Sequence, residues 1–436
     1  MVDKKGVLAG TLFAVSVALL LSFVQIDEFP LIIGFYTVAF IAYAYIVLRV
    51  PPKFLLVLAF GLRIVAVFSF PGLSDDIYRF LWDGWLITEG INPYAYLPVD
   101  VPLPLGDFHK MLLEKMNSPE YYSVYPSVLQ ALFTSAAYII PESLYGQMVC
   151  IKVILFIAEI GTFILGSKVL ERMGRDKRLI YLYFLNPLVI VELIGNMHME
   201  LLMIFGFAVF LWGLHEKKGL AWSVFGLAFS VASKLVTAIS FPFLLKRLTK
   251  KELLIYGSMM VVVMGILFGP MVVGSYENFG KGLDLYFQKF EFNASVYFLV
   301  RQVGYWITGY NVIGKAGPFL GLIAGLLVLV LAWREKEAGI GSLCKRVLWA
   351  LTIYYLLSTT VHPWYTSLLV FLSIFTNVRY AYVWSFLALL SYAKYYDDGS
   401  LYYWMVALEY VLLAVFIFGL EPKNIFRMKN PLKLGT

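Results

Sequence analysis

The sequence predicts an all-α fold, that of a polytopic helical membrane protein with about 12 to 14 transmembrane helices. Hydrophobic residues make up 61% of the 436 residues and charged residues only 14%, whereas a soluble domain carries about 25% charged residues. Apolar runs of roughly 20 residues recur along the chain, and each is long enough to cross about 30 Å of hydrocarbon as a helix. Lys and Arg, which give a net charge of +7, stand in short clusters between these runs, as in cytoplasmic loops that face anionic lipids. We therefore expect membrane lipids as partners and no nucleic acid.

Three membrane spans are predicted before the first long polar segment. Lys4 and Lys5 place the N-terminus in the cytoplasm, because basic residues are retained on that side. The spans cover about residues 5–25, 30–49 and 53–70, so the chain reaches the external face after the third span.

The next segment, residues 71–123, is predicted to be a large external loop rich in acidic and aromatic residues. The apolar run that follows, residues 124–141, is predicted to be an external or re-entrant helix. If this run crossed the membrane, the span after it would leave the basic stretch ERMGRDKR outside, against the positive-inside rule.

The later spans alternate between basic clusters inside and polar turns outside. One of them contains Asn186-Pro187, which is predicted to break or kink the helix. These spans begin near residues 145, 179, 201, 253, 312, 347, 367 and 380, with one further pair that turns near Lys234 and one final span. The arrangement predicts a single integral domain over residues 1–436 in the plasma or inner membrane, with both termini cytoplasmic.

Polar side chains gather at the predicted outer ends of the spans. Charged groups near membrane depth are expensive and tend to mark functional sites. We therefore expect a site on the external face, formed from Asp75, Asp76, Asn196, His198, Glu200, Lys234 and His362.

Asp75 and Asp76 are adjacent, so on a helix their side chains diverge by about 100°. Two interpretations remain open. Both carboxylates cap a short helix, or pair with Arg79; alternatively, one of them faces a cavity as a general base, with a pKa raised by partial desolvation. The nearby Asp83 is expected to be a surface or capping carboxylate, and Tyr94 fits an interfacial aromatic belt.

His198 and Glu200 are two residues apart and do not share a helical face, so a metal site built from these two alone is not expected. With Asn196 they crowd one external turn and could line a substrate cavity. Lys234 either snorkels to the interface or binds an anionic head group such as a phosphate, a role for which Arg301 competes.

The segment that begins at His362 offers two further interpretations. Trp364 and Tyr365 fit an aromatic belt at the outer face. His362 at the start of a helix would be a neutral hydrogen-bonding group near pH 7.

Several stretches, in this order, resemble the GT-C superfamily of polytopic glycosyltransferases, and in particular the bacterial polyprenyl-phosphate-mannose-dependent mannosyltransferases. They are SDDIYRFLWDG, GINPYAY, YPSVLQALF, NPLVIVELIGNMHMELL, SKLVTAISFPFLL, EFNASVYFLVRQVGY and HPWYTSLLVFL. The resemblance implies inverting transfer of a sugar, mannose, from a polyprenyl-phosphate donor to a hydroxyl of a lipid or glycan acceptor. It implies Asp75 or Asp76 as the base, and the Asp-x-x-Tyr spacing favours Asp75.

The same resemblance implies that Lys234 or Arg301 binds the donor phosphate. The residues that would bind substrate are Arg79, Tyr94, Asn196, His198, Glu200, His362, Trp364 and Tyr365. No cofactor is expected; a divalent metal at Asp75 and Asp76 is an alternative that is not favoured, because only this pair offers hard oxygen ligands.

Two other functions remain open at this point. A lipid or saccharide transporter or flippase would also need many spans, although the chain shows no internal repeat and its polar groups gather at one face. A polysaccharide polymerase or ligase would differ in using a diphosphate-linked oligosaccharide donor.

Overall fold

The computed structural model describes residues 2–215, 219–273, 275–278, 280–281, 290–397 and 399–420. Within these residues the chain is built from helices, and the only β contact is an isolated parallel bridge between Phe292 and Thr360. The prediction of an all-α fold is therefore confirmed.

The helices differ widely in length. The α-helices are α1 (Lys4–Ser22), α2 (Phe29–Arg49), α3 (Pro52–Phe68), α4 (Asp76–Thr88), α5 (Asp107–Lys115), α6 (Ser127–Ile139), α7 (Leu144–Arg172), α8 (Tyr181–Phe184), α9 (Glu200–His215), α10 (Leu220–Ser233), α11 (Phe241–Leu244), α12 (Lys250–Val272), α14 (Val296–Thr308), α15 (Ile313–Trp333), α16 (Ile340–Leu357), α17 (Thr366–Ser373), α18 (Tyr380–Leu387), α19 (Ala393–Tyr396) and α20 (Ser400–Val415). Short 3-10 helices cover Pro98–Asp100, Lys177–Ile180, Leu235–Ser240, Pro363–Tyr365 and Ala388–Tyr392, and π-helices cover Val189–Gly195 and Phe416–Leu420.

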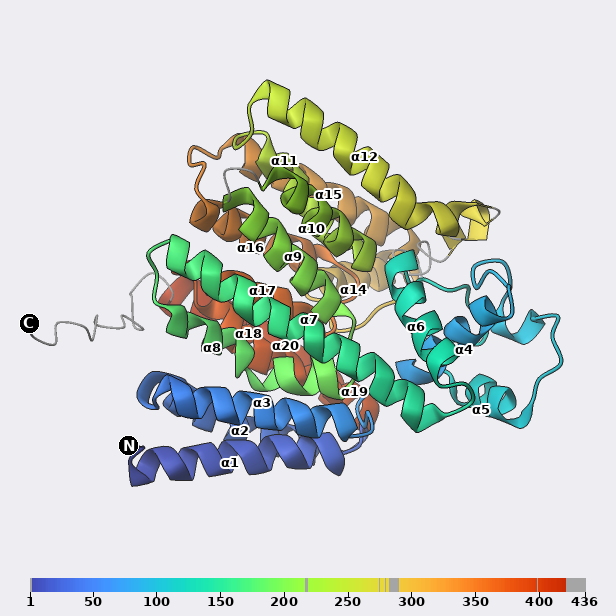
Figure 1. Cartoon of the computed structure of the whole chain (residues 1–436), viewed down its shortest axis with the longest axis horizontal. Helices are drawn as coiled ribbons and strands as arrows, with labels where there is room; N and C mark the ends of the chain where they lie inside the picture. Colours follow the sequence, from blue (N-terminus) through green and yellow to red (C-terminus); the bar gives the residue numbers. More distant parts are fainter. Residues whose placement is uncertain are drawn as a thin grey trace, which may run out of the picture.

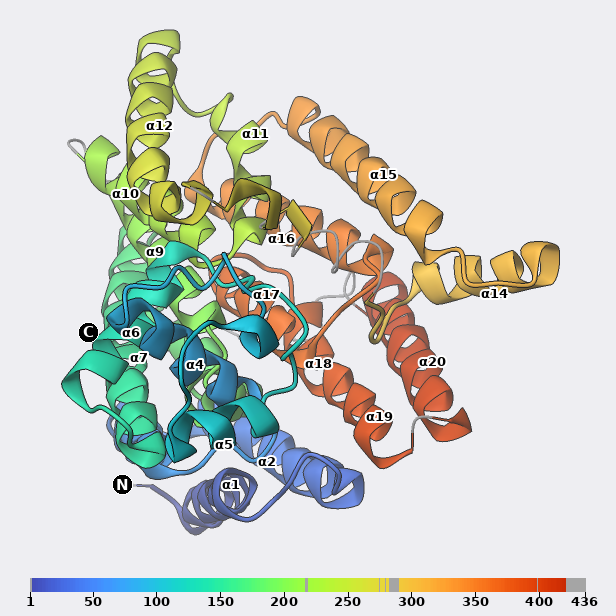
Figure 2. The same ribbon diagram turned by 90° about the vertical axis from the view of Figure 1, so that its right-hand side faces the viewer.

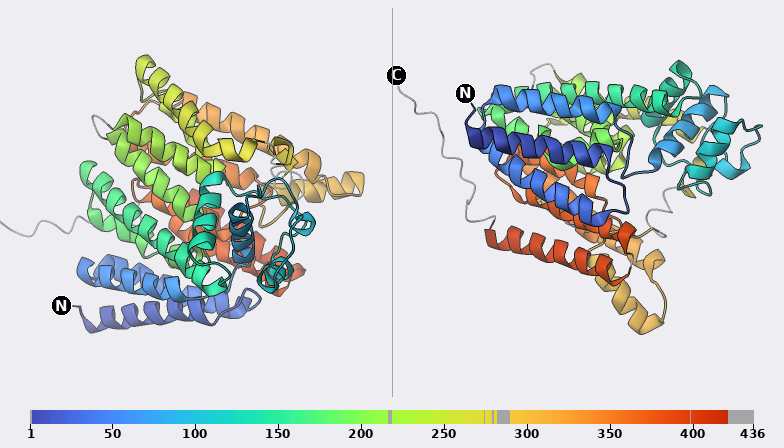
Figure 3. Two further views of the ribbon diagram at one scale, coloured as in Figure 1. Left: turned by 45° about the vertical axis from the view of Figure 1, so that its right-hand side comes forward. Right: turned by 90° about the horizontal axis from the view of Figure 1, so that it is seen from below.

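The long helices lie side by side in a bundle, and α4, α5 and α6 form a separate group at one end of it (Figure 1). The start of α1 lies at the opposite end. Figure 2 looks onto the end that carries α4, α5 and α6, and it shows α14 at the periphery beside α15. Figure 3 shows the same separation of the small group from the bundle in two further directions.

Seven helices among the described residues are long and apolar enough to cross a membrane, which agrees with a multi-pass membrane protein. They become eight if the two bent pieces Lys177–Phe184 and Val189–Gly195 count as one span. The number is lower than the predicted 12 to 14 because several predicted spans form shorter apolar helices, such as α9 and α10.

The bend at Asn186-Pro187 confirms the predicted helix break. The pieces on its two sides meet at 63°. Proline cannot donate to the preceding turn, and the Asn186 side chain accepts from the Leu188 amide at 3.0 Å and donates to Ser385 Oγ at 3.0 Å. Hydrogen bonds of the Asn186 side chain thus replace helical hydrogen bonds lost at the break.

Segments predicted to lie in the cytoplasm meet one another in space. Arg178 donates to the Val50 carbonyl at 3.0 Å, and Arg175 donates to the Thr376 carbonyl at 2.8 Å. The basic loops after α2, α7 and α17 therefore share one end of the bundle, as the alternating topology requires.

A buried ion pair joins α3 to α7 inside the bundle. Arg63 donates through Nε and Nη2 to the two carboxylate oxygens of Glu159 at 2.8 and 2.6 Å, and both side chains are fully buried. The guanidinium also covers the Phe184 ring at 3.6 Å from its centroid.

We expect Arg63→Met to destabilise the protein by about 3–5 kcal/mol, because it leaves Glu159 charged and unpaired in an apolar interior. Thermal unfolding in detergent measures the effect. The double variant Arg63→Met/Glu159→Gln should regain much of the loss, and a single variant as stable as the wild type would contradict the prediction.

Candidate active site

The acidic pair opens α4 at the end of the bundle. Asp75 occupies the N-cap position without capping the helix through its side chain, and it is exposed. Asp76 accepts from Asn117 Nδ2 at 3.1 Å. Partial burial, followed by the negative charge of Asp76, raises the pKa of Asp75. Of the pair, only Asp76 accepts a side-chain hydrogen bond from another described residue.

Arg79 and Asp83 form hydrogen bonds within residues 71–123, the segment that is predicted to be external. Arg79 Nε donates to Asp83 at 2.8 Å, and its Nη1 donates to the Ser118 and Tyr121 carbonyls, both at 2.9 Å. Asp83 is fully buried and also accepts from Gln130 Nε2 at 2.9 Å. The expectation of a surface carboxylate at Asp83 was wrong, because α6 packs over this side of α4.

Tyr94 is likewise turned into the external segment. Its hydroxyl donates to the Tyr125 carbonyl at 2.6 Å, and the residue is buried. The structure therefore places Arg79 and Tyr94, both predicted to bind substrate, in contacts that shape the loop.

A buried carboxylate, Glu192, lies at the centre of the polar cluster on the π-helix Val189–Gly195. Its Oε1 accepts from the hydroxyls of Tyr36 and Tyr392, each at 3.0 Å. Its Oε2 accepts from Asn196 Nδ2 at 3.2 Å and lies 3.2 Å from His198 Nε2. π-Helical turns are frequent at functional sites, and this one collects groups from α2, the 3-10 helix at 388–392 and the turn that precedes α9.

Hydrogen bonds of two side chains join the residues just before Asp75 to the end of this π-helix. Asn196 Oδ1 accepts from the Leu73 amide at 3.1 Å, two residues before Asp75. The buried Lys152 ammonium donates to the carbonyls of Ser69 and Gly195 at 2.5 and 2.8 Å. The position of the acidic pair is therefore set by the π-helix as well as by its own loop.

Four aromatic rings form a column beside Glu192. His198 stacks on Trp364 with centroids 3.5 Å apart, Trp364 stacks on His362 at 4.4 Å, and His362 stacks on Phe292 at 4.6 Å. Burial, followed by the positive charge of Lys234 and by the proximity of His198, lowers the pKa of His362 well below its usual value. His362 is thus a neutral imidazole near pH 7.

Phe292 is held in this column by its backbone. Its amide donates to the Thr359 carbonyl at 3.0 Å, and its carbonyl accepts from the Val361 amide at 2.8 Å. These are the hydrogen bonds of the isolated bridge.

Lys234 lies in the break between α10 and the 3-10 helix Leu235–Ser240. Its ammonium forms an ion pair with the buried Glu200 at the start of α9, and it sits 4.0 Å from the centroid of the Tyr365 ring. The backbones of α9 and α10 pack closely, since a Cβ at Gly226 would lie 2.4 Å from the Phe210 amide nitrogen. The start of α9 and the end of α10 lie at the end of the bundle that carries α4 (Figure 1).

Arg301, the competing cation, lies elsewhere. It belongs to α14 at the periphery (Figure 2), where it pairs with Glu291 and covers the Phe298 ring at 4.5 Å. Its guanidinium is therefore already engaged outside the cluster.

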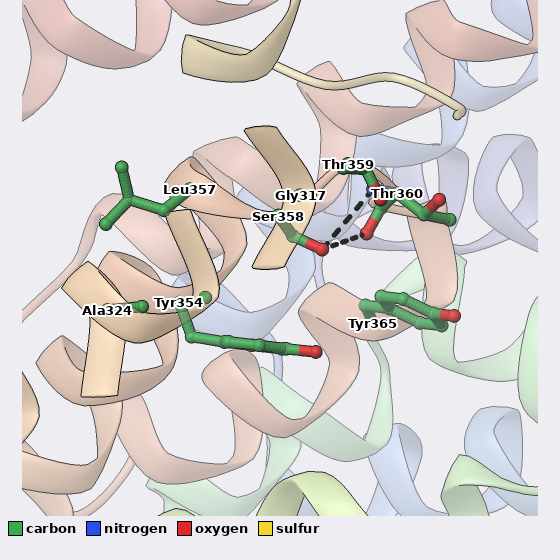
Figure 4. A pocket seen from close by; sticks show the side chains of 9 residues that line it. Gly317, Ala324, Tyr354, Leu357, Ser358, Thr359, Thr360 and Tyr365 are labelled. Carbon is green, nitrogen blue, oxygen red and sulfur yellow. Dashed lines mark hydrogen bonds between the residues drawn. The ribbon is translucent and has the colours of Figure 1, made fainter. Parts of the chain in front are cut away.

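A small cavity of about 60 Å³ opens between α15 and α16, and Tyr365 is among the residues that line it (Figure 4). Small residues of α15 line one side, and the hydroxyl-bearing stretch after α16 lines the other; they are Gly317, Gly321, Ala324, Tyr354, Leu357, Ser358, Thr359, Thr360 and Tyr365. Tyr365 also contacts the Lys234 ammonium, so one side chain adjoins both the cavity and this group.

Tyr395 on α19 links the acidic pair to the column. Partial burial, followed by the charges of Asp76, Asp75 and Glu192, raises the pKa of Tyr395 to about 12. Its ring lies 6.1 Å from that of Phe292. Tyr395 therefore lies beside the column and close enough to the acidic pair and Glu192 to sense their charges.

The structure thus brings together most of the predicted site residues: Asp75, Asp76, Asn196, His198, Glu200, Lys234, His362, Trp364 and Tyr365. Sequence reasoning missed Glu192, Lys152 and Tyr395. A signal for Glu192 was present, since it is the lone carboxylate in the apolar run NPLVIVELIGN, and a charge within a membrane span indicates a site by default.

The expectation that the acidic pair needs no divalent cation stays a prediction. Among the described residues, no three His, Cys, Asp or Glu side chains form a group that could hold a metal ion. Asp76 is occupied by Asn117, and Ca²⁺ or Mg²⁺ normally takes six or more oxygen ligands, some of them from water.

The fold and the clustered polar groups define a polytopic all-α membrane protein with a charged site at one end of its bundle. Residues 33–250 match the family of the alpha-(1->6)-mannopyranosyltransferase N-terminal domain. The match covers half of the chain, and the chain belongs to this family of mannosyltransferases. It includes Asp75, Glu192, His198 and Lys234. No curated protein and no solved structure matches the chain.

Proposed function

We propose that this GT-C-type glycosyltransferase moves mannose from a polyprenyl-phosphate donor to a hydroxyl of a lipid or glycan acceptor. The reaction takes place on the external face of the plasma or inner membrane, with both termini in the cytoplasm. The observation that carries the proposal is the convergence of the acidic pair, the His198–Trp364–His362 column and Lys234 at one end of the bundle.

The proposed chemistry is a single displacement. Asp75 takes the proton from the acceptor hydroxyl, whose oxygen then bonds to the anomeric carbon of the sugar. The bond from that carbon to the phosphate oxygen breaks, and Lys234 stabilises the charge that develops on the departing lipid phosphate. One displacement inverts the anomeric centre, and no step needs a metal.

The cavity between α15 and α16 provides a path for the lipid chain of the donor. It lies between two helices that are long and apolar enough to span the membrane, and it ends beside the ring that contacts Lys234. A chain held there would deliver its phosphate to the ammonium group.

We expect Gly321→Leu to raise KM for a long-chain donor about tenfold or more, because the new side chain fills this path, while a short-chain donor is affected much less. A Cβ atom at Gly321 would meet no atom within 4 Å, so the backbone there has room for a side chain. Gly325→Leu is the matched control, since Gly325 lies on the same helix, has equal free space and does not line the cavity. Equal effects of the two substitutions would contradict the assignment.

The test of the function uses purified protein, radiolabelled polyprenyl-phosphate-mannose and a lipid extract of the producing cells. Transfer of label to a new product, with and without EDTA, supports the proposal. Folded protein that neither binds this donor nor transfers its sugar would refute it and favour transport.

A further inference from the structure

Glu192 is a fully buried carboxylate that the proposed reaction does not use. A carboxylate only accepts hydrogen bonds, and it has about four acceptor positions. Here these positions face two tyrosine hydroxyls, the Asn196 amide and His198 Nε2, all within 3.0–3.2 Å. Four groups thus surround this one carboxylate. One of them is His198, a residue of the candidate site.

His198 is restrained in two ways. Trp364 covers a face of its ring, with the ring planes inclined by 18°, and Glu192 lies at Nε2. Nε2 makes no hydrogen bond in this geometry, and the Glu192 carboxylate lies 3.2 Å from it. In the described part of the chain no group bonds Nδ1 of this imidazole.

For the neutral form of His198, the tautomer follows from this geometry. A neutral imidazole carries one N–H and one acceptor nitrogen. Since Glu192 only accepts, the hydrogen belongs on Nε2 and the acceptor lone pair on Nδ1. His198 therefore presents an acceptor rather than a donor to whatever occupies the site.

We propose that Glu192 is a positioning residue, which fixes His198 so that Nδ1 accepts a hydrogen bond from one hydroxyl of the transferred sugar. The inference rests on the proposed function. The sugar is assigned rather than the acceptor because His198 is joined through Trp364 and His362 to Tyr365, the ring beneath Lys234. Lys234 also pairs with Glu200, which follows His198 by two residues, so we place the sugar of a donor whose phosphate lies at Lys234 beside His198.

The experiment compares donors that lack single hydroxyls, the 2-, 3-, 4- and 6-deoxy forms of polyprenyl-phosphate-mannose. With wild-type protein, one deoxy donor should react markedly more slowly than the others. In Glu192→Gln the amide can donate to Nε2, which moves the hydrogen to Nδ1. We expect kcat with the complete donor to fall about 10–100-fold, as it does when the partner that orients a functional histidine is removed. We also expect the slower reaction of that one deoxy donor, relative to the complete donor, to disappear.

Two further variants separate positioning from folding. His198→Asn places an amide oxygen near the position of Nδ1 and should keep the deoxy penalty, also when combined with Glu192→Gln. His198→Gln places its amide near Nε2 and should lose the penalty. Glu159→Gln, a second buried carboxylate that faces Arg63, should lower stability and leave the penalty intact.

The outcomes are distinct. Wild-type protein that transfers mannose with no penalty for any deoxy donor overturns the inference, as does Glu192→Gln with unchanged kcat and penalty. If Glu192→Gln does not fold, the comparison of the two His198 variants decides. An equal penalty for the deoxy donor in His198→Asn and His198→Gln overturns the inference. Wild-type protein that fails to transfer mannose at all refutes the proposed function, and the inference falls with it.

Discussion

Asp75→Asn is expected to lower the rate of mannose transfer by about 10²–10⁴-fold, the usual contribution of a positioned general base. Donor binding should survive, because the amide keeps the size of the side chain and does not touch the Lys234 region. Single-turnover transfer and donor binding are measured in parallel. Asp100→Asn, which changes another exposed carboxylate of the external segment, is the matched control and should transfer at the wild-type rate.

Asp76→Asn distinguishes the two members of the pair. Because Asp76 accepts from Asn117, we expect a smaller loss than for Asp75→Asn. A greater loss in Asp76→Asn would reassign the base, and wild-type rates in both variants would exclude base catalysis by this pair.

The rate should also depend on pH in a defined direction. A base must be unprotonated, and the pKa of Asp75 is raised by partial burial and by Asp76. Transfer should therefore be lost as the pH falls through a midpoint above the ordinary range of an aspartate, and Asp76→Asn should move that midpoint down. A pH profile of kcat/KM checks both points, and a midpoint that does not move would contradict the assigned cause.

Lys234→Met is expected to lower the transfer rate by about 10²–10³-fold, because removal of one group that stabilises developing charge typically has this effect. The variant also leaves the buried Glu200 without its partner, so its stability should fall. The measurements are single-turnover transfer and thermal unfolding in detergent. Arg301→Met, which changes a cation paired with Glu291, should have a much smaller effect on transfer.

A double variant separates these two effects of Lys234. Lys234→Met/Glu200→Gln removes both charges and should regain stability without regaining transfer. If transfer returned with stability, Lys234 would act only as the partner of Glu200 and would have no role at the phosphate.

Much of the candidate site could be predicted because its residues break an apolar pattern. A carboxylate pair after a membrane span, or a lysine inside SVFGLAFSVASKLVTAISFPFLL, is conspicuous in the chain. Such residues could be assigned to one end of the bundle from the topology, without knowledge of their neighbours. Their partners could not be assigned in this way, and Arg79 illustrates the difference: the same guanidinium fits a substrate contact or the buried bond to Asp83 that the structure shows.

The sequence by itself determined the all-α membrane class, the break at Asn186-Pro187 and the gathering of polar residues at one end, because hydropathy, proline chemistry and charge act locally along the chain. Only the tertiary structure decided which of these groups meet. Tyr392 binds Glu192 across 200 residues of sequence and Tyr36 across 156, and the ring column joins His198 to His362 through Trp364. Such pairings depend on how helices pack around one another, a property that no local pattern of residues contains.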